Sequence, residues 1–394
     1  MTAKRSPPLA RPLLLLTGIL LIAANLRAPI TGVAPVLEMI RDATGLGTAG
    51  AGTLTTLPLL AFAIASPFCV LLGREYGLER SLFVALMLVT GGVVLRSLGP
   101  VWSLFLGTGI IGVGIAIGNV LLPSLLKRDF PNRIAALTSA YALTAGVVAA
   151  LASAAAVPIA TLPGSGWNWA LGAFLLVPLL ALVVWSPQLA GRTAPASGTA
   201  GPLHGGRIWR SALAWQVTVF FGLNSLVYYV TVTWLPAILT DAGYSPASAG
   251  SLHGVSQLAT AVPGMILGPL VGRLKDQKAL AAGTAVLTAL ALLGILLLPG
   301  WAVLWAALFG FGSGGTFILA LAFISLRAAS VQQAAALSGM AQTVGYTIAA
   351  AAPPLGGMLH DTSGGWLMPL IACVALCGIT AAFGYRAGRD LHIT

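Results

Sequence analysis

The chain has 394 residues, of which 58% are hydrophobic and only 7% carry a charge. A water-soluble domain carries roughly 25% charged residues because its surface must be hydrated, so this composition excludes a soluble globular protein. The formal net charge of +11 would indicate a nucleic-acid partner in a soluble chain, but the positions of the charges argue against that interpretation.

Apolar runs of about 20 residues, each long enough to cross a hydrocarbon core of ~30 Å, recur along the whole chain. A β-barrel would show alternating segments of about ten residues instead, and the sequence contains no such segments. We therefore predict an all-α polytopic membrane protein with twelve transmembrane helices. The predicted spans are residues 13–38, 48–72, 81–99, 101–126, 134–158, 166–186, 211–238, 247–271, 279–299, 301–325, 333–357 and 366–386.

The basic residues lie almost entirely in alternate loops between the predicted spans. If the N-terminus is cytoplasmic, 17 of the 20 lysines and arginines fall on the inner side, and the exceptions are Arg27, Arg41 and Arg96. Positively charged loops stay in the cytoplasm during insertion. We therefore expect a multi-pass protein of a bacterial inner membrane with both termini cytoplasmic, and no nucleic-acid partner.

The two halves of the chain repeat each other at an offset of about 200 residues. Lys127 after the fourth span matches Arg327 after the tenth, and prolines in the first and seventh spans agree with nearly the same register. Transporters are often built from duplicated halves. The sequence predicts two pseudo-two-fold-related six-helix bundles, residues 1–187 and 210–394, joined by a cytoplasmic linker, residues 188–209, that is rich in Gly, Pro, Ser and Ala.

Twelve spans in two parallel halves with a central inner loop resemble the architecture of the major facilitator superfamily. Within that superfamily, three motifs resemble the cyanate permease and 2-nitroimidazole transporter family. They are "NLRAPITGVAP" in the first span, "GNVLLPSLLKRDFP" at residues 118–131 and "YYVTVTWLPAIL" at residues 228–239. The resemblance implies the major facilitator fold and alternating-access transport of a small solute.

The loop after the second span departs from the superfamily signature G-x-L-x-D-R-x-G-R-R. The sequence "LLGREYGLER" has Arg74 at the place of the aspartate. A gating ion pair built on that aspartate is therefore not implied, and Glu75 or Glu79 would have to replace it. The residues that we expect to act in gating at the cytoplasmic loops are Arg74, Glu75, Arg80 and Arg273.

Arg27 is the one basic residue that the sequence places deep within a span, because Arg41 and Arg96 lie at outer ends. An arginine at the centre of a membrane helix costs about 2.5–3.5 kcal/mol on insertion scales, so it must face a partner, the bundle interior or water. All nine acidic residues fall at span ends or in loops, away from the depth of Arg27. We therefore predict that the planar donor fork of Arg27 binds a substrate anion. The alternative is a structural or gating role in which Arg27 bonds backbone carbonyls or polar groups.

Other polar side chains within the spans would complete the site. Matching the two halves places Tyr228 opposite Arg27, and Asn224 lies one turn before Tyr228 on the same helix face. The predicted substrate-binding residues are Asn25, Arg27, Thr31, Asn119, Tyr141, Asn224, Tyr228, His253, Gln257, Gln342 and Tyr346. For the uncharged members, hydrogen bonding between helices is the alternative role.

His253 is the only one of the four histidines that lies in a predicted span. Histidine is the side chain whose charge changes nearest to physiological pH, so His253 is the candidate for proton coupling. A place in the outer vestibule is the alternative, since His253 lies near the outer end of its span. Cys69, Cys373 and Cys377 fall in apolar spans and indicate core packing, and we predict no metal site and no cofactor.

These features predict a secondary active transporter, not an enzyme, that moves a small anion (cyanate-like or oxyanion-like) or a small polar planar solute. It would work as a monomer because each chain encloses its own pathway, with a proton as the candidate coupling ion. The first alternative is an exporter of neutral or hydrophobic compounds such as nitroimidazoles, with Arg27 as a gate. A membrane enzyme or receptor would need a catalytic constellation or a signalling domain, and an ion channel would not need duplicated halves.

Overall fold

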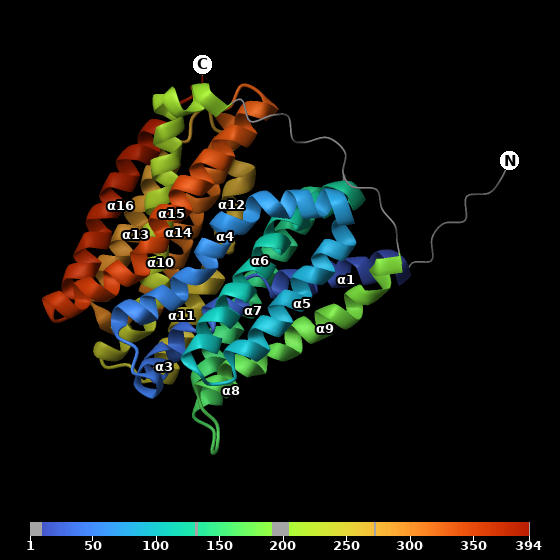
Figure 1. Cartoon of the computed structure of the whole chain (residues 1–394). Helices are drawn as coiled ribbons and strands as arrows, with labels where there is room; N and C mark the ends of the chain where they lie inside the picture. The colour runs from blue at the N-terminus through green and yellow to red at the C-terminus, as the bar shows by residue number, and fades with distance from the viewer. Residues whose placement is uncertain (1–9, 131–132, 191–204, 272, 394) are drawn as a thin grey trace.

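The computed structural model describes residues 10–130, 133–190, 205–271 and 273–393, and every regular element in these ranges is a helix (Figure 1). The first half contains α1 (Ala10–Ala24), α2 (Ala28–Thr31), η1 (Ala34–Val36), α3 (Leu37–Thr44), α4 (Thr48–Tyr76), α5 (Leu78–Arg96), α6 (Val101–Asp129), α7 (Ile134–Ala160), α8 (Trp167–Gly172), η3 (Ala173–Leu175), α9 (Leu176–Trp185) and η4 (Ser186–Ala190). The second half contains η5 (Gly205–Arg210), α10 (Ala212–Asp241), α11 (Pro246–Ala259), α12 (Val262–Val271), α13 (Lys278–Leu297), η6 (Pro299–Trp301), α14 (Ala302–Leu326), α15 (Val331–Ser363) and α16 (Leu367–Ala387). The prediction of an all-α membrane protein is confirmed.

Ten helical stretches in the described residues are long and apolar enough to cross a membrane. They coincide with predicted spans one to seven, nine, ten and twelve. The eighth predicted span is occupied by α11 followed by α12, and the eleventh by α15, a helix of 33 residues. The helices therefore follow one another in the predicted order. Most of the predicted linker lies outside the described residues, between η4 and η5.

Two of the predicted spans are interrupted helices, whereas the sequence analysis treated each as continuous. The first span breaks at residues 25–27, between α1 and α2, and the eighth breaks at residues 260–261, between α11 and α12. A proline follows each break, at Pro29 and Pro263. Proline lacks an N–H group and clashes with the preceding helical turn, so each break has a local cause in the sequence.

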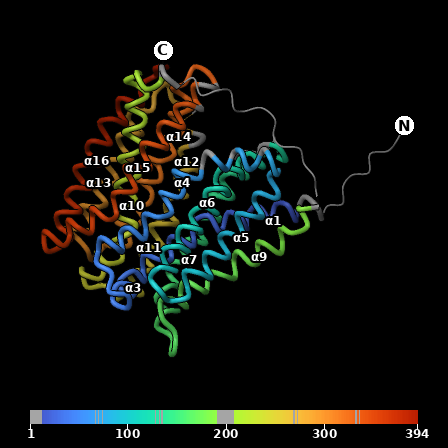
Figure 2. Tube along the Cα trace, viewed as in Figure 1, coloured from blue at the N-terminus to red at the C-terminus, as the bar shows by residue number. Residues whose placement is uncertain are grey.

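The helices of the first half, blue to green, lie beside those of the second half, yellow-green to red (Figure 2). The largest hydrophobic core is shared, because it joins Val33 and Leu54 of the first half to Trp234 and Leu239 of the second, and a smaller shared cluster joins Leu59 to Ala349. A second core contains residues of the first half alone, from Ile19 to Trp185, and a third contains residues of the second half alone. The halves are thus packed together at one end of the molecule and have separate cores at the other.

Contacts between the halves follow two helix pairs and reach only part of their length. Helix α4 meets α15 from Thr48, which donates a hydrogen bond to Asp361, to Phe62, whose ring stacks on Tyr346 at 6.3 Å. Helices α7 and α11 meet where Ser153, in the last third of α7, donates to the carbonyl of Gly250, in the first third of α11, at 2.9 Å. The second and third cores lie at the end of each half that carries the predicted cytoplasmic loops. If the termini are cytoplasmic as predicted, the two halves are separated on the cytoplasmic side.

Candidate substrate-binding site

Arg27 lies at the break in the first span and is half-buried. It is the N-cap of α2, with φ −128° and ψ −42°, and its carbonyl accepts hydrogen bonds from the N–H groups of Ile30 and Thr31, both at 3.0 Å. Pro29 lies in the first turn of α2, where its missing N–H costs no helical hydrogen bond. The local sequence therefore starts a new helix directly after Arg27.

The Arg27 guanidinium donates two hydrogen bonds across the interface between the halves. One goes to the Tyr228 hydroxyl on α10 at 2.6 Å, and the other to the Thr260 hydroxyl at 2.9 Å. Thr260 lies at the break in the eighth span, and its hydroxyl donates to the Gln257 carbonyl at 2.7 Å. The two interrupted spans therefore face each other, with the cation at the C-terminal, electronegative end of α11.

A chain of hydrogen-bonded side chains continues from Arg27 into the interior. The Tyr228 hydroxyl donates to Gln257 Oε1 at 2.9 Å, and Gln257 Nε2 lies 3.2 Å from His253 Nε2. The other ring nitrogen of His253, Nδ1, lies 2.6 Å from Ser153 Oγ on α7. His253, Gln257 and Ser153 are fully buried. The chain therefore leaves the first half at Arg27, passes through the second half, and returns to the first half at Ser153.

No ion pair among the described residues involves Arg27. Two of the carboxylates of the first half pair elsewhere: Glu38 with Arg41 at 2.8 Å, and Glu79 with Arg128 at 2.6 Å. The hydrogen-bond partners of the Arg27 guanidinium in the described residues are thus two neutral hydroxyls. An anion would add Coulomb attraction to such hydrogen bonds, so it would be a better partner than either hydroxyl.

Aromatic rings surround this part of the interface. Tyr228 packs edge-on against Tyr229, with ring centres 5.1 Å apart, and stacks on Phe309 at 6.5 Å with an interplanar angle of 3°. Tyr346 packs edge-on against Phe221 at 5.4 Å. Flat apolar faces next to hydrogen-bond donors favour a planar ligand over a bulky one.

Four members of the predicted set, Arg27, Tyr228, His253 and Gln257, belong to this hydrogen-bonded chain. Three others bond backbone carbonyls instead. Asn25 donates to Leu21 at 2.8 Å within α1, Thr31 donates to Ala149 of α7 at 3.3 Å, and Asn224 donates to Ser313 of α14 at 3.3 Å. Each of the three is at least 95% buried, so these bonds match the alternative role of joining helices or turns.

The remaining four predicted residues make no hydrogen bond to Arg27 in the described part of the chain. Asn119 on α6 and Gln342 on α15 are exposed, and Gln342 donates to the Ser338 hydroxyl at 2.7 Å. Tyr141 on α7 is half-buried against the first-half core, and Tyr346 lies one turn beyond Gln342, where its ring stacks on Phe62. These four side chains therefore do not belong to the hydrogen-bonded chain that starts at Arg27.

Sequence reasoning missed two members of the site, Thr260 and Ser153. Pro263, three residues after Thr260, was a signal that the helix breaks there and frees a hydroxyl. No signal in the sequence marked Ser153, because its position depends on how closely α7 approaches α11. That approach relies on Gly254: a Cβ at this position would lie 2.7 Å from the Ala150 carbonyl oxygen.

The cytoplasmic-loop residues proposed for gating do not form ion pairs between the halves in the described part of the chain. Glu75, Arg80 and Arg273 are exposed, and the side chain of Arg74 lies outside the described residues. The charged cluster found there is Arg128 with Asp129 and Glu79, all in the first half. Hydrogen bonds from Arg128 to Asp129 and Glu79 raise the pKa of this arginine, so it stays charged and fastens α6 to α5.

No group of three or more His, Cys, Asp or Glu side chains in the described residues is arranged to hold a metal ion. Cys69, Cys373 and Cys377 are free and buried.

Comparison with known proteins places these features in a family context. The sequence profile of the Major Facilitator Superfamily matches residues 15–350. The 2-nitroimidazole transporter of Escherichia coli strain K12 is 54% identical over 381 residues, which covers 97% of each chain. The cyanate transport protein CynX of the same strain is 31% identical over 369 residues, covering 92% of this chain and 94% of that one. Among solved structures, a D-xylose–proton symporter superposes with a TM-score of 0.79 at 14% identity, covering 96% of this chain and 98% of the other.

Proposed function

Because the chain belongs to the major facilitator superfamily and is a secondary transporter of its cyanate permease and 2-nitroimidazole transporter branch, we propose that it carries a small planar anion anchored by Arg27. It works by alternating access, as a monomer in the bacterial inner membrane with both termini cytoplasmic. One observation carries the proposal. Where the two interrupted spans meet, the Arg27 guanidinium has hydroxyl partners and, among the described residues, no carboxylate.

Binding exchanges these hydroxyls for the anion. The guanidinium offers parallel N–H donors that suit a carboxylate, another oxyanion or cyanate. Tyr228 and Thr260 both belong to the second half, so an anion that replaces them on Arg27 releases two of the bonds that tie the halves together. Occupation of the site is thereby linked to the relative motion of the two halves.

The approach to the anchor is lined by the other members of the predicted set. Asn119 and Gln342 are exposed on α6 and α15, and Tyr141 and Tyr346 lie deeper on α7 and α15. In the proposed cycle these polar and aromatic groups guide the solute from the cytoplasmic side to Arg27. Asn25, Thr31 and Asn224 support the helices around the anchor through their bonds to backbone carbonyls.

Proton coupling through His253 follows from the same charges. The groups that face its ring are the Ser153 hydroxyl, the Gln257 amide and the Val232 carbonyl, and Arg27 is the charge that acts on it. Burial opposes a positive charge on the imidazole, and the charge of Arg27 adds to that opposition. A bound anion offsets the contribution of Arg27, so anion and proton bind with positive cooperativity. The proposed cycle is therefore anion–proton symport.

Counterflow of labelled cyanate into proteoliposomes tests the anchor. Losing two charge-assisted hydrogen bonds, at about 1.5–3 kcal/mol each, predicts that Arg27→Met lowers cyanate transport at subsaturating concentration by about 100-fold or more. Arg27→Lys keeps the charge without the fork and should fall in between. Arg41→Met, which removes a half-buried arginine paired with Glu38, is the control and should transport normally. Cyanate counterflow by Arg27→Met at the rate of the unaltered protein would refute the anchor.

A second candidate is the export of a neutral planar compound, with Arg27 acting only as a gate. The observation that favours it is the pair of bonds by which Arg27 itself ties the two halves together. The two candidates separate when cyanate and 2-nitroimidazole are compared in the same vesicles. An anchor predicts that Arg27→Met loses cyanate transport far more than 2-nitroimidazole transport, whereas a gate predicts equal losses of both.

A further inference from the structure

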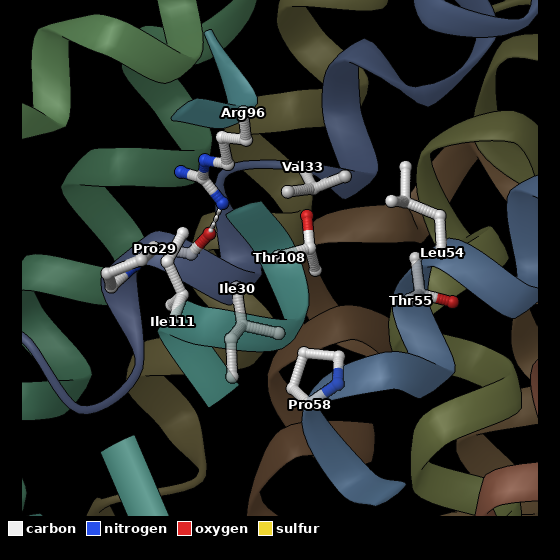
Figure 3. Close-up of a pocket in the computed structure, with 9 residues that line it drawn as sticks. All are labelled: Pro29, Ile30, Val33, Leu54, Thr55, Pro58, Arg96, Thr108 and Ile111. Atoms are coloured by element: carbon white, nitrogen blue, oxygen red, sulfur yellow. Dashed lines mark hydrogen bonds between the residues drawn. The ribbon is translucent and has the colours of Figure 1, made fainter. Parts of the chain in front are cut away.

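A second buried arginine lies behind the broken segment of the first span. Arg96 is the last residue of α5 and is 1% exposed. Close packing of α6 holds its backbone, since a Cβ on Gly107 would lie 2.5 Å from the Arg96 backbone nitrogen. The backbone of Arg96 is therefore held in place, and its guanidinium extends to the Pro29 carbonyl of α2 (Figure 3).

Arg96 bonds a carbonyl that loses its helical donor where α2 ends, at Gly32 and Val33. In a regular α-helix the Val33 N–H would donate to the Pro29 carbonyl four residues earlier. In this structure the Val33 N–H donates to Ile30 at 3.2 Å, and an Nη of Arg96 donates to the Pro29 carbonyl at 2.5 Å. The guanidinium thus takes the place of the missing helical donor at the C-terminal end of α2.

The charge of Arg96 has no carboxylate partner among the described residues, and its Nε and second terminal nitrogen are buried without a hydrogen-bond partner there. A buried cation in this situation is costly, and an apolar side chain of similar size would pack at lower cost. Packing alone therefore does not account for an arginine at this position. The bond from Arg96 to the Pro29 carbonyl is a contact that a methionine at this position could not make.

Figure 3 shows the residues around a small cavity next to this contact. It is lined by Pro29, Ile30, Val33, Leu54, Thr55, Pro58, Arg96, Thr108 and Ile111, and its volume is about 10 Å³. A volume of this size holds about one water molecule. The bond from Arg96 to the Pro29 carbonyl is a polar contact at this otherwise mostly apolar lining.

We infer that Arg96 is a positioning residue for the anion site, because its bond to the Pro29 carbonyl holds α2, the short helix that begins directly after Arg27. Only one residue separates Arg27 from Pro29 in the chain, so a shift of α2 moves the Arg27 backbone directly. This inference rests on the proposed function for the role of Arg27. The conformational part, that Arg96 holds α2 in place, stands on the geometry alone.

The test compares Arg96→Met and Arg96→Lys with Arg327→Met. Arg327 is a matched control because it is 2% exposed and also donates to backbone carbonyls, those of Ala387 and Gly388, but it lies in the second half far from α2. The first readout is hydrogen exchange, by mass spectrometry, of a peptide that covers residues 25–33. We expect at least tenfold faster exchange there in Arg96→Met, partial rescue in Arg96→Lys, and no change in Arg327→Met.

The second readout is the KM for cyanate in proteoliposomes. We expect Arg96→Met to raise the KM at least fivefold, Arg327→Met to leave it within twofold, and Arg96→Met to add nothing further in the Arg27→Met background. Unchanged exchange over residues 25–33 in Arg96→Met would overturn the inference whatever the transport data show. Normal cyanate transport by Arg27→Met would instead overturn the proposed function and leave the exchange result standing.

Discussion

At the scale of single residues, the account depends on which partner a polar side chain meets in the interior. Arg27 could be found from the sequence because a cation in an apolar run without acidic neighbours is rare and costly. The roles of Asn224 and Thr31 could not be found in this way. Their amide and hydroxyl groups bond backbone carbonyls of other helices, and the sequence does not show which carbonyls a side chain will reach.

Replacing Tyr228 by phenylalanine should strengthen anion binding. The Tyr228 hydroxyl must leave Arg27 before the anion can take its place, and a hydrogen bond to a charged group contributes about 1.5–3 kcal/mol. We expect at least a roughly tenfold lower Kd for cyanate in Tyr228→Phe, measured by titration calorimetry. Tyr244→Phe is the control, since its hydroxyl donates to the Pro299 carbonyl outside the site. A weaker Kd in Tyr228→Phe would mean that this hydroxyl binds the anion directly.

At the scale of helices, most elements could be predicted because long apolar runs define them. The breaks in the first and eighth spans were not predicted, although Pro29 and Pro263 mark them. Proline is tolerated in membrane helices when neighbouring groups bond the freed backbone groups. A proline alone therefore does not show whether a helix is kinked or interrupted. The Pro29 carbonyl is bonded by Arg96, which is far away in the sequence.

The contact between α4 and α15 depends on a glycine. A Cβ at Gly52 would lie 2.6 Å from backbone atoms of Pro354, which cannot move aside as a flexible side chain could. Gly52→Ala should therefore separate the halves at this end and reduce cyanate counterflow by at least tenfold. Gly109→Ala, on α6 where no atom lies within 4 Å of the added carbon, should behave like the unaltered protein. Equal activity of the two variants would contradict the role of this contact.

At the scale of the whole molecule, the two halves share a core at one end and have separate cores at the other. The duplicated sequence predicts two bundles, but it cannot say in which conformation they meet. That depends on small differences among inter-half contacts, such as the bond between Thr48 and Asp361. These contacts must form and break during transport, so no single contact can be as stable as a packed core.

The bond between Thr48 and Asp361 predicts a defined pH dependence. The Thr48 hydroxyl, and next the His360 ring, lower the pKa of Asp361 from its usual 3.8. A carboxylate with a lowered pKa contributes stability above its usual pKa and loses that contribution as the pH falls through the lowered value. The contribution of Asp361 to the contact between the halves should therefore be constant between pH 6 and 8. It should weaken only below about pH 4.

Asp361→Asn should weaken the same contact at neutral pH. Because the carboxylate is half-exposed, we expect at most about 1 kcal/mol, or up to fivefold more of the conformer that is open at this end. Distances between spin labels at positions 53 and 362 would report the two populations. Asp276→Asn is the control, because Asp276 pairs with Lys278 within the second half. Identical distance distributions in both variants would show that Asp361 does not hold the halves together.

The central claim is that Arg27 receives the substrate anion, and the most direct measurement locates an anion in the protein. Selenocyanate is a linear analogue of cyanate whose selenium scatters anomalously. Diffraction from crystals soaked with selenocyanate should show a selenium peak within about 4 Å of the Arg27 guanidinium, between Tyr228 and Thr260, and no such peak in Arg27→Met. A selenium peak at another site, or one that persists unchanged in Arg27→Met, would contradict the account.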